Sequence, residues 1–168
     1  MIRKKKLFVR PKKLYQAGRI KEENALAEKY GLKNKREIWK SLAKIKYYRD
    51  RAKALTKAPS EEQKIFFAKL QRIGLKAETI ADVLALNIED LLQRRLSSIV
   101  AKKGLATTPQ HARQMVVHKK VSIAGKTVNI PSYIVALDEE HTIIVESPKP
   151  TAASRKAESS ESSQGETA

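Results

Sequence analysis

Residues 107–133 read TTPQHARQMVVHKKVSIAGKTVNIPSY, and within this stretch the apolar period changes from helical to alternating. Thr108 followed by Pro109 is typical of an N-cap and a first helical residue, and predicts a helix that runs to about Lys120. Beyond that helix, apolar and polar residues alternate on both sides of an Ala-Gly pair at residues 124–125, which is typical of a tight turn between two strands. The stretch therefore predicts a helix followed by a β-hairpin.

Helices are expected over most of the chain before residue 107. Residues 34–57 carry the strongest pattern, because Asn34 and Glu37 have the spacing of a capping box and apolar residues recur at helical spacing. The apolar stripe consists of Ile38, Leu42, Ile45, Ala52 and Leu55. Other helices are predicted over residues 21–30, 60–73, 79–86 and 87–103.

The remaining parts of the chain differ in character. Two more strands are expected at residues 133–137 and 142–145, joined by an acidic turn. The first 20 residues mix Lys and Arg with isolated apolar residues, and Pro11 and Gly18 interrupt them, so we predict an extended arm that orders on a partner. From Ser147 onward the composition is polar and without period, which predicts a disordered tail.

Positive charge is concentrated near the N-terminus. The 168 residues include 35 Lys and Arg against 18 Asp and Glu, a formal net charge of +17. Residues 1–57 hold 20 of the basic residues and five of the acidic ones. Such dense charges repel one another, and a polyanion removes the repulsion while releasing its own counterions. Nucleic acid is therefore the expected partner.

Two other interpretations of the charge are weaker. Solubility needs a net charge of only ~2–8 for a small domain. Binding to an anionic membrane needs apolar residues that are free to insert, whereas the apolar stripe of residues 34–57 is expected to be buried in the protein. No apolar run has the ~18 residues of a membrane helix, and no signal-peptide pattern follows Met1, so a soluble, cytoplasmic protein is expected.

The residues do not predict catalysis, a metal or a cofactor. Cys is absent, which excludes disulfides and thiolate metal sites. His111 and His118 lie seven residues apart, ~10 Å along a helix, which is too far for one metal ion to bridge. The sequence also lacks a nucleophile elbow, a P-loop and a dinucleotide-binding glycine motif.

The candidate RNA-binding residues fall into two sets. On the helix over residues 34–57, basic side chains outside the apolar stripe can face phosphates; they include Arg36, Lys40, Lys44 and Arg51. Farther along, the helix that begins after Thr108 offers an N-terminal anion site, and its polar face can reach sugars or bases. This second set comprises Arg95, Lys102, Thr107, Thr108, His111, Arg113, Gln114, His118, Lys119, Lys120 and Lys126.

Short motifs between residues 91 and 133 resemble the S-four RNA-binding domain: LLQRRL (91–96), KGLA (103–106), QHARQ (110–114), His118, AGK (124–126) and IPSY (130–133). Upstream, YGLKNKREIW (30–39) resembles the universal S-four family of small-subunit ribosomal proteins, in its archaeal type. The resemblance covers about residues 20–147. Ser97 and Ala124 depart from it, because many members have Asp and Asn there.

The resemblance implies a structural protein of the small ribosomal subunit, not an enzyme. It implies binding to the 5′ domain of small-subunit rRNA, nucleation of the subunit body and an influence on translational accuracy. The implied partners are this rRNA, small-subunit ribosomal protein five and mRNA where it enters the subunit, with the protein a monomer in the ribosome. The implied RNA-facing residues are Arg95, Thr108, Arg113, Gln114, His118, Lys119, Lys120, Lys126 and Tyr133.

Two alternatives remain at this point. A free-standing RNA chaperone that acts on ribosomal particles could carry the same domain, but it would not need the basic first 57 residues. An RNA-modifying enzyme could carry it as an accessory, but residues 1–90 are too basic and too poor in candidate acids to form a catalytic domain.

The predicted fold class is α+β, with a helical N-terminal domain, an extended basic arm, a small helix–helix–hairpin RNA-binding domain and a disordered C-terminal tail. We expect the arm at residues 1–20, the helical rRNA-binding domain at 21–91, the S-four-type domain at 92–147 and the tail at 148–168.

Overall fold

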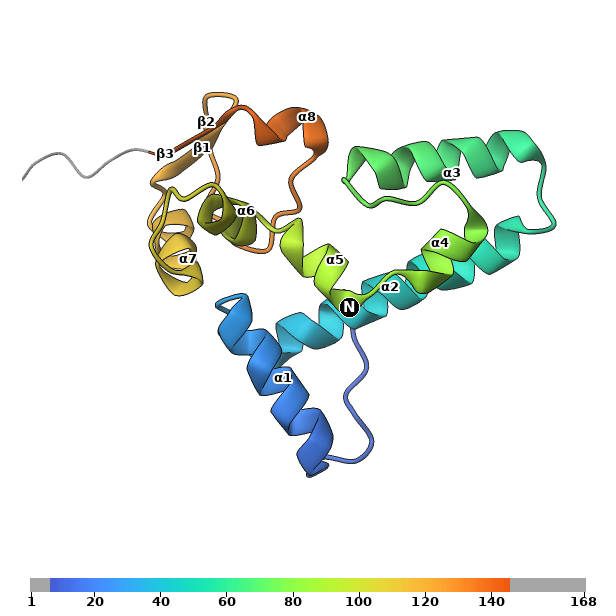
Figure 1. Ribbon diagram of the computed structural model, residues 1–168, viewed down its shortest axis with the longest axis horizontal. Helices are drawn as coiled ribbons and strands as arrows, with labels where there is room; N and C mark the ends of the chain where they lie inside the picture. The colour runs from blue at the N-terminus through green and yellow to red at the C-terminus, as the bar shows by residue number, and fades with distance from the viewer. Residues whose placement is uncertain (1–6, 146–168) are drawn as a thin grey trace, which may run out of the picture.

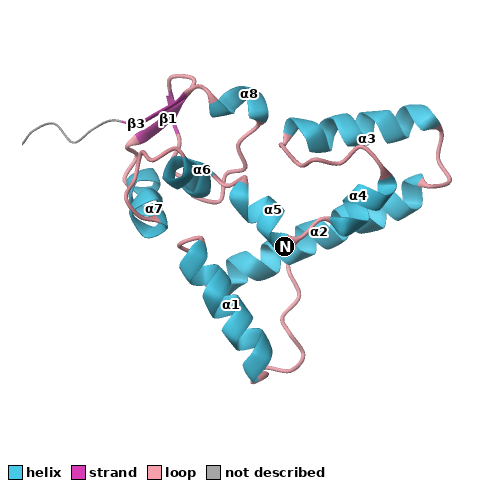
Figure 2. Ribbon diagram, viewed as in Figure 1, coloured by secondary structure: helices cyan, strands magenta, loops and turns pink. Residues whose placement is uncertain are grey.

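Helices dominate the computed structural model, which describes residues 7–145, and three short strands form one small sheet (Figures 1 and 2). The expected α+β class is confirmed, whereas the predicted tail lies outside the described residues. The elements are α1 (Ala17–Lys29), α2 (Lys35–Leu55), α3 (Ser60–Arg72), α4 (Ile80–Ala85), α5 (Ile88–Gln93), α6 (Leu96–Lys102), α7 (Pro109–Val117), β1 (Val121–Ile123), β2 (Lys126–Thr127), α8 (Leu137–Glu140) and β3 (Ile143–Val145).

One apolar core lies around α2. Helices α4 and α5 pack on α2, and α3 contributes Leu70 to the same core. The buried residues are Ile45, Tyr48, Ala52, Leu70, Leu75, Ala77, Val83, Leu86 and Leu91. Most of the predicted stripe is therefore buried, but Leu42 is half exposed, because the elements that cover the rest of the stripe do not close over it.

A second apolar core lies between α6, α7 and the sheet. The sheet is antiparallel with the order β2-β1-β3, and Val121 and Ile123 of β1 point into the core. Helices α6 and α7 pack against each other and supply Leu96, Ile99, Val100, Ala112, Met115 and Val116. In Figure 1 these elements and α8 form one group, α2, α3 and α4 form another, and α5 lies between them.

The helix predicted over residues 87–103 is wrong, because the chain breaks into α5 and α6 at Arg94 and Arg95. The backbone groups at the break bond to a distant segment: Val135 N–H donates to the Arg94 carbonyl (3.0 Å), and Leu96 N–H donates to the Tyr133 carbonyl (2.8 Å). These bonds replace the helical pattern, so the predicted strand 133–137 is reduced to a single bridge with Arg95. The predicted turn at 138–141 is largely the short helix α8.

The segment before α1 is partly ordered by the protein itself. Helix α1 begins at Ala17, four residues before the predicted start, and includes Gly18. The Phe8 ring packs on Trp39 of α2, with ring centroids 6.0 Å apart. The Arg19 guanidinium also donates to two carbonyls of the preceding turn, at 2.9 Å each. Residues 8 and 19 therefore have partners within the protein, while the ordering of the arm on a binding partner stays a prediction.

The turn that follows α1 lies tightly against the beginning of α7. Gly31 adopts φ +58, and a Cβ there would lie 2.7 Å from the carbonyl carbon of Pro109. At the break between α5 and α6, the Arg94 guanidinium donates to the Ile73 carbonyl (2.9 Å), to Glu140 (2.8 Å) and to the Val135 carbonyl (3.1 Å). The close approach of Gly31 to Pro109 thus joins the turn after α1 to α7, and Arg94 joins the end of α3 to α8.

We expect Ala124→Asn to stabilise the fold. Ala124 and Gly125 adopt φ +48 and +76, and Asn tolerates the left-handed region better than Ala. The free energy of unfolding should rise by about 0.5–1 kcal/mol in urea denaturation. Ala124→Val is the matched control and should lower it, because a β-branched side chain is strained at positive φ. Equal stability of the two variants would contradict the assigned turn.

Candidate nucleic-acid interface

The structure brings five of the predicted RNA-binding residues to one groove of about 830 Å³. The groove lies between α2 and a wall formed by residues 91–95, residues 131–134 and α7. The five residues are Arg36, Lys40, Lys44, Arg95 and Arg113. The spacing of the first three along α2 placed them on one helix face, but only the fold reveals the opposite wall.

The cations on the α2 side differ in exposure. Arg36 and Lys40 are exposed, whereas Lys44 is half-buried. Burial lowers the pKa of Lys44, and the charge of Lys69 lowers it further. The Lys44 Nζ lies 6.0 Å from the centroid of the Tyr48 ring, within the distance of a cation–π contact.

Glu37 holds the two arginines of the opposite wall. Its carboxylate accepts two hydrogen bonds from Arg113, at 2.8 and 3.0 Å, and one from Arg95. The predicted capping box of Asn34 and Glu37 is therefore wrong, and Asn34 makes no side-chain cap hydrogen bond. Glu37 is instead committed to a charge cluster that joins α2 to the second core.

The pKa of Glu37 reflects this cluster. Burial alone would raise the pKa of the carboxyl, but hydrogen bonds from Arg113 and Arg95 and their positive charges outweigh burial. The net pKa of Glu37 lies below its ordinary value of 4.5. The carboxylate therefore stays ionised between the two guanidinium groups at neutral pH.

Three predicted RNA-facing residues have protein partners in the structure. The Arg95 side chain is only 4% exposed, because the break between α5 and α6 turns it towards Glu37. Arg113 is half-buried against the same carboxylate. The Tyr133 hydroxyl donates to Glu139, at 2.9 Å for the shorter bond, and this bond raises the pKa of Tyr133, with burial second. Direct RNA contacts from these three stay predictions.

The other predicted residues apart from Arg51 are exposed on α6, α7 and the hairpin, which we call the α7–hairpin surface. Thr108 caps α7 by accepting from the His111 N–H (3.1 Å), as predicted, and the Thr107 hydroxyl lies 3.3 Å from His111 Nδ1. The exposed residues of the α7–hairpin surface are Lys102, Thr107, Thr108, His111, Gln114, His118, Lys119, Lys120 and Lys126. Arg51 is exposed farther along α2 and belongs to neither surface.

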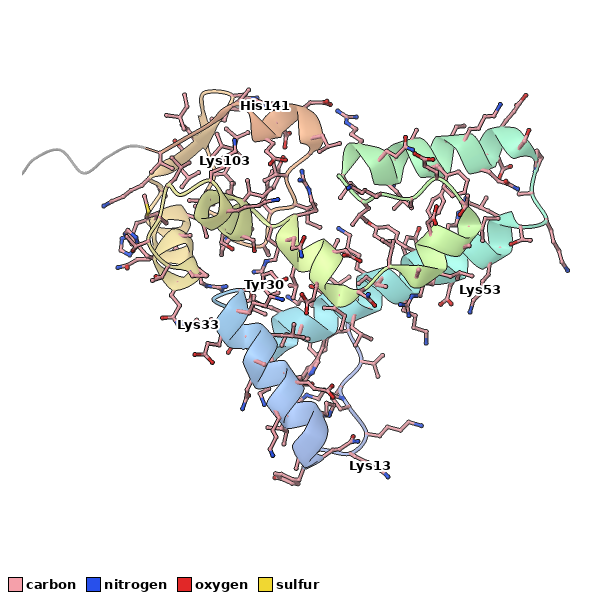
Figure 3. All side chains as sticks on the ribbon, viewed as in Figure 1. Lys13, Tyr30, Lys33, Lys53, Lys103 and His141 are labelled. Atoms are coloured by element: carbon pink, nitrogen blue, oxygen red, sulfur yellow. The ribbon has the colours of Figure 1, made fainter. Side chains whose placement is uncertain are left out.

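Basic side chains extend over the whole described molecule. Figure 3 places Lys13 before α1, Lys33 at the connection from α1 to α2, Lys53 on α2 and Lys103 after α6. Within residues 7–145, no group of three potential ligand side chains could hold a metal ion. In the same range, no helix is long and apolar enough to span a membrane.

Sequence reasoning missed several residues of the groove, among them Glu37 as an interaction partner and Tyr47 as a lining residue. Tyr47 is 63% exposed. A signal for Tyr47 was present, because it lies outside the predicted stripe within the basic run KIKYYR at residues 44–49. Glu37 gave no such signal, since its capping-box position already explained it.

Comparison with known proteins finds related sequences. The sequence model of the S4 domain matches residues 94–141. A "Small ribosomal subunit protein uS4" from Methanococcus aeolicus is 45% identical over 132 residues, which are 74% of this chain and 75% of the relative. The protein of the same name from Ignicoccus hospitalis is 47% identical over 131 residues, covering 74% and 79%. That from Halobacterium salinarum is 43% identical over 143 residues, covering 82% and 83%.

We expect Glu37→Gln to lower the free energy of unfolding by about 2–4 kcal/mol at pH 7, because it leaves a buried guanidinium without its carboxylate. In the unaltered protein this contribution is present above the ordinary pKa of 4.5 and is lost as the pH falls through the lowered pKa. Urea denaturation should therefore show that the free energy of unfolding decreases less between pH 7 and pH 3 in the variant than in the unaltered protein.

The control is Glu28→Gln, since Glu28 is an exposed glutamate on α1. It should leave the stability at pH 7 nearly unchanged. If Glu37→Gln were as stable as this control, the charge cluster would not hold the two cores together.

Proposed function

Because the chain belongs to the uS4 family of small ribosomal subunit proteins, we propose that it is a structural constituent of the small subunit that binds small-subunit rRNA. It acts by binding and not by catalysis. The observation that carries the proposal is the presence, among the described residues, of unpaired cations on two surfaces. The ion pairs of Glu37 with Arg95 and Arg113 join the elements that carry these surfaces.

The groove supports phosphate binding because its one acidic residue is already neutralised. Among the described lining residues, Glu37 is the only carboxylate, and Arg95 and Arg113 occupy it. Arg36, Lys40 and Lys44 form no ion pair within the described residues. Their charges are therefore available to an incoming phosphate.

The α7–hairpin surface supports recognition of folded RNA. Pro109 has no N–H and Thr108 accepts from the His111 N–H, so the donors of α7 are those of its exposed polar face, which includes His111, Gln114 and His118. Lys119, Lys120 and the hairpin residue Lys126 extend this surface. Polar side chains on a helix face and lysines on a hairpin suit reading of backbone and shape, which is how proteins recognise structured RNA.

We further propose the finer role implied by the sequence motifs. The protein binds the 5′ domain of the rRNA, nucleates assembly of the subunit body and contributes to translational accuracy. It lies beside small-subunit ribosomal protein five, close to where mRNA enters, as a monomer in the cytoplasmic ribosome. The division proposed at residues 91 and 92 follows the two cores, since Leu91 belongs to the first and Leu96 to the second.

The experiment is the salt dependence of binding to a transcript of the 5′ domain. We expect the affinity to fall by orders of magnitude between about 50 and 200 mM salt if ~6–10 phosphates are contacted. Replacing Lys119, Lys120 and Lys126 together with Gln should reduce the slope of log K against log salt by about two to three. Filter binding over a salt series measures both quantities.

The matched control replaces Lys57, Lys64 and Lys76 with Gln, which removes the same charge from exposed positions outside both surfaces. This control should retain most of the slope. If the variant at Lys119, Lys120 and Lys126 had the same slope as the control, the assigned surface would be wrong. If binding of the unaltered protein did not depend on salt, the proposed function would be wrong. In sedimentation of cell extract, tagged protein that migrates only free or with the large subunit would favour a free-standing chaperone over a small-subunit protein.

A further inference from the structure

We infer that the groove between α2 and the second core binds an unpaired segment of the rRNA, with one base stacked on Tyr47 and the adjoining phosphates over Lys40 and Lys44. This inference rests on the proposed function and specifies the form of RNA that the groove takes. The single-stranded form follows from the stacking, because a base within a duplex does not expose its face to a side chain.

Tyr47 is the feature that requires an explanation. It lines the groove and is 63% exposed, whereas the neighbouring Tyr48 is buried in the first core. The two rings lie 5.9 Å apart at an interplanar angle of 56°, and the Tyr47 ring stays largely open to solvent. An open aromatic ring is the platform on which proteins stack unpaired bases.

The cations lie at the spacing that a strand needs. Lys44 precedes Tyr47 by three residues and Lys40 by seven, which corresponds to about 5 and 10 Å along the helix. All three side chains line the groove. A positive track beside an aromatic ring is the usual combination in proteins that bind single-stranded nucleic acid.

The size and polarity of the groove agree with a few nucleotides. Its volume of about 830 Å³ is within the range of small-ligand sites. Asn34 and Ser132, which are both exposed, add polar groups to its lining, and the Asn34 amide is not used as a helix cap. Because Glu37 is neutralised by two arginines, the groove does not repel a phosphate.

The test is binding of the full chain to the 5′-domain transcript, with Tyr47→Ala as the main variant. We expect its affinity to fall about tenfold or more, as for the loss of one stacked base, with the salt slope unchanged. Lys40→Gln with Lys44→Gln should instead reduce the slope by about one to two, since these residues contact phosphates. The two kinds of variant therefore separate stacking from charge.

Two controls accompany it. Tyr47→Phe keeps the ring and should bind like the unaltered protein, which excludes a hydrogen bond of the hydroxyl as the cause. Ile65→Ala removes a 71% exposed apolar side chain outside the groove and should also bind normally. Thermal denaturation of Tyr47→Ala should match that of the unaltered protein, because the ring is exposed. Ultraviolet cross-linking should attach a nucleotide to the peptide that contains Tyr47.

The outcomes distinguish the inference from the proposed function. If the unaltered protein binds the transcript with steep salt dependence but Tyr47→Ala binds equally well, the inference is wrong and the proposed function stands. Failure of Tyr47→Phe to retain affinity would also overturn the stacking. If the unaltered protein does not bind the transcript, the proposed function fails and the inference fails with it. Loss of affinity with rescue by Phe supports both.

Discussion

One carboxylate, that of Glu37, joins the two cores of this molecule. It accepts hydrogen bonds from Arg95 at the break between α5 and α6 and from Arg113 on α7, while its own helix belongs to the first core. A guanidinium as buried as that of Arg95 is costly without a partner, so the two cores cannot separate at this point without a large loss of stability. The groove exists because this cluster holds its two walls in place.

The two consecutive arginines at the break act in different directions. Arg95 reaches α2 through Glu37, whereas Arg94 bonds to the end of α3 and to Glu140 of α8. The backbone between them is free to bond to residues 133–135, because the helix is interrupted there. The break at Arg94 and Arg95 thus supplies contacts that hold distant elements together. Because the two walls of the groove are already in place, a ligand that binds there does not have to order them.

The sequence predicted those parts of the structure that depend on local chemistry. Thr108 and Pro109 set the beginning of α7, and the Ala-Gly pair set the turn between β1 and β2. It did not predict the break at Arg94, because the hydrogen bonds that replace the helix come from a segment about 40 residues away. The α2 residues of the groove could be assigned from helical spacing, but Arg95 could not be placed, since its burial depends on a partner in another element. Glu37 shows the same limit, because a capping-box pattern and a tertiary ion pair use the same side chain.

The few acidic residues of the N-terminal third are used unequally, and this explains how so basic a chain folds. Residues 1–57 hold five acidic residues, and two of them, Glu23 and Glu37, are shielded from water and paired with arginines. Glu23 also accepts a hydrogen bond from Trp39 (2.9 Å), so it anchors α1 to α2 as Glu37 anchors α2 to the second core. Ion pairs shielded from water are screened little by salt, whereas the exposed lysines on α2 are screened strongly. Structural cohesion therefore depends on a few shielded carboxylates, and the excess of exposed cations is left available for a polyanion.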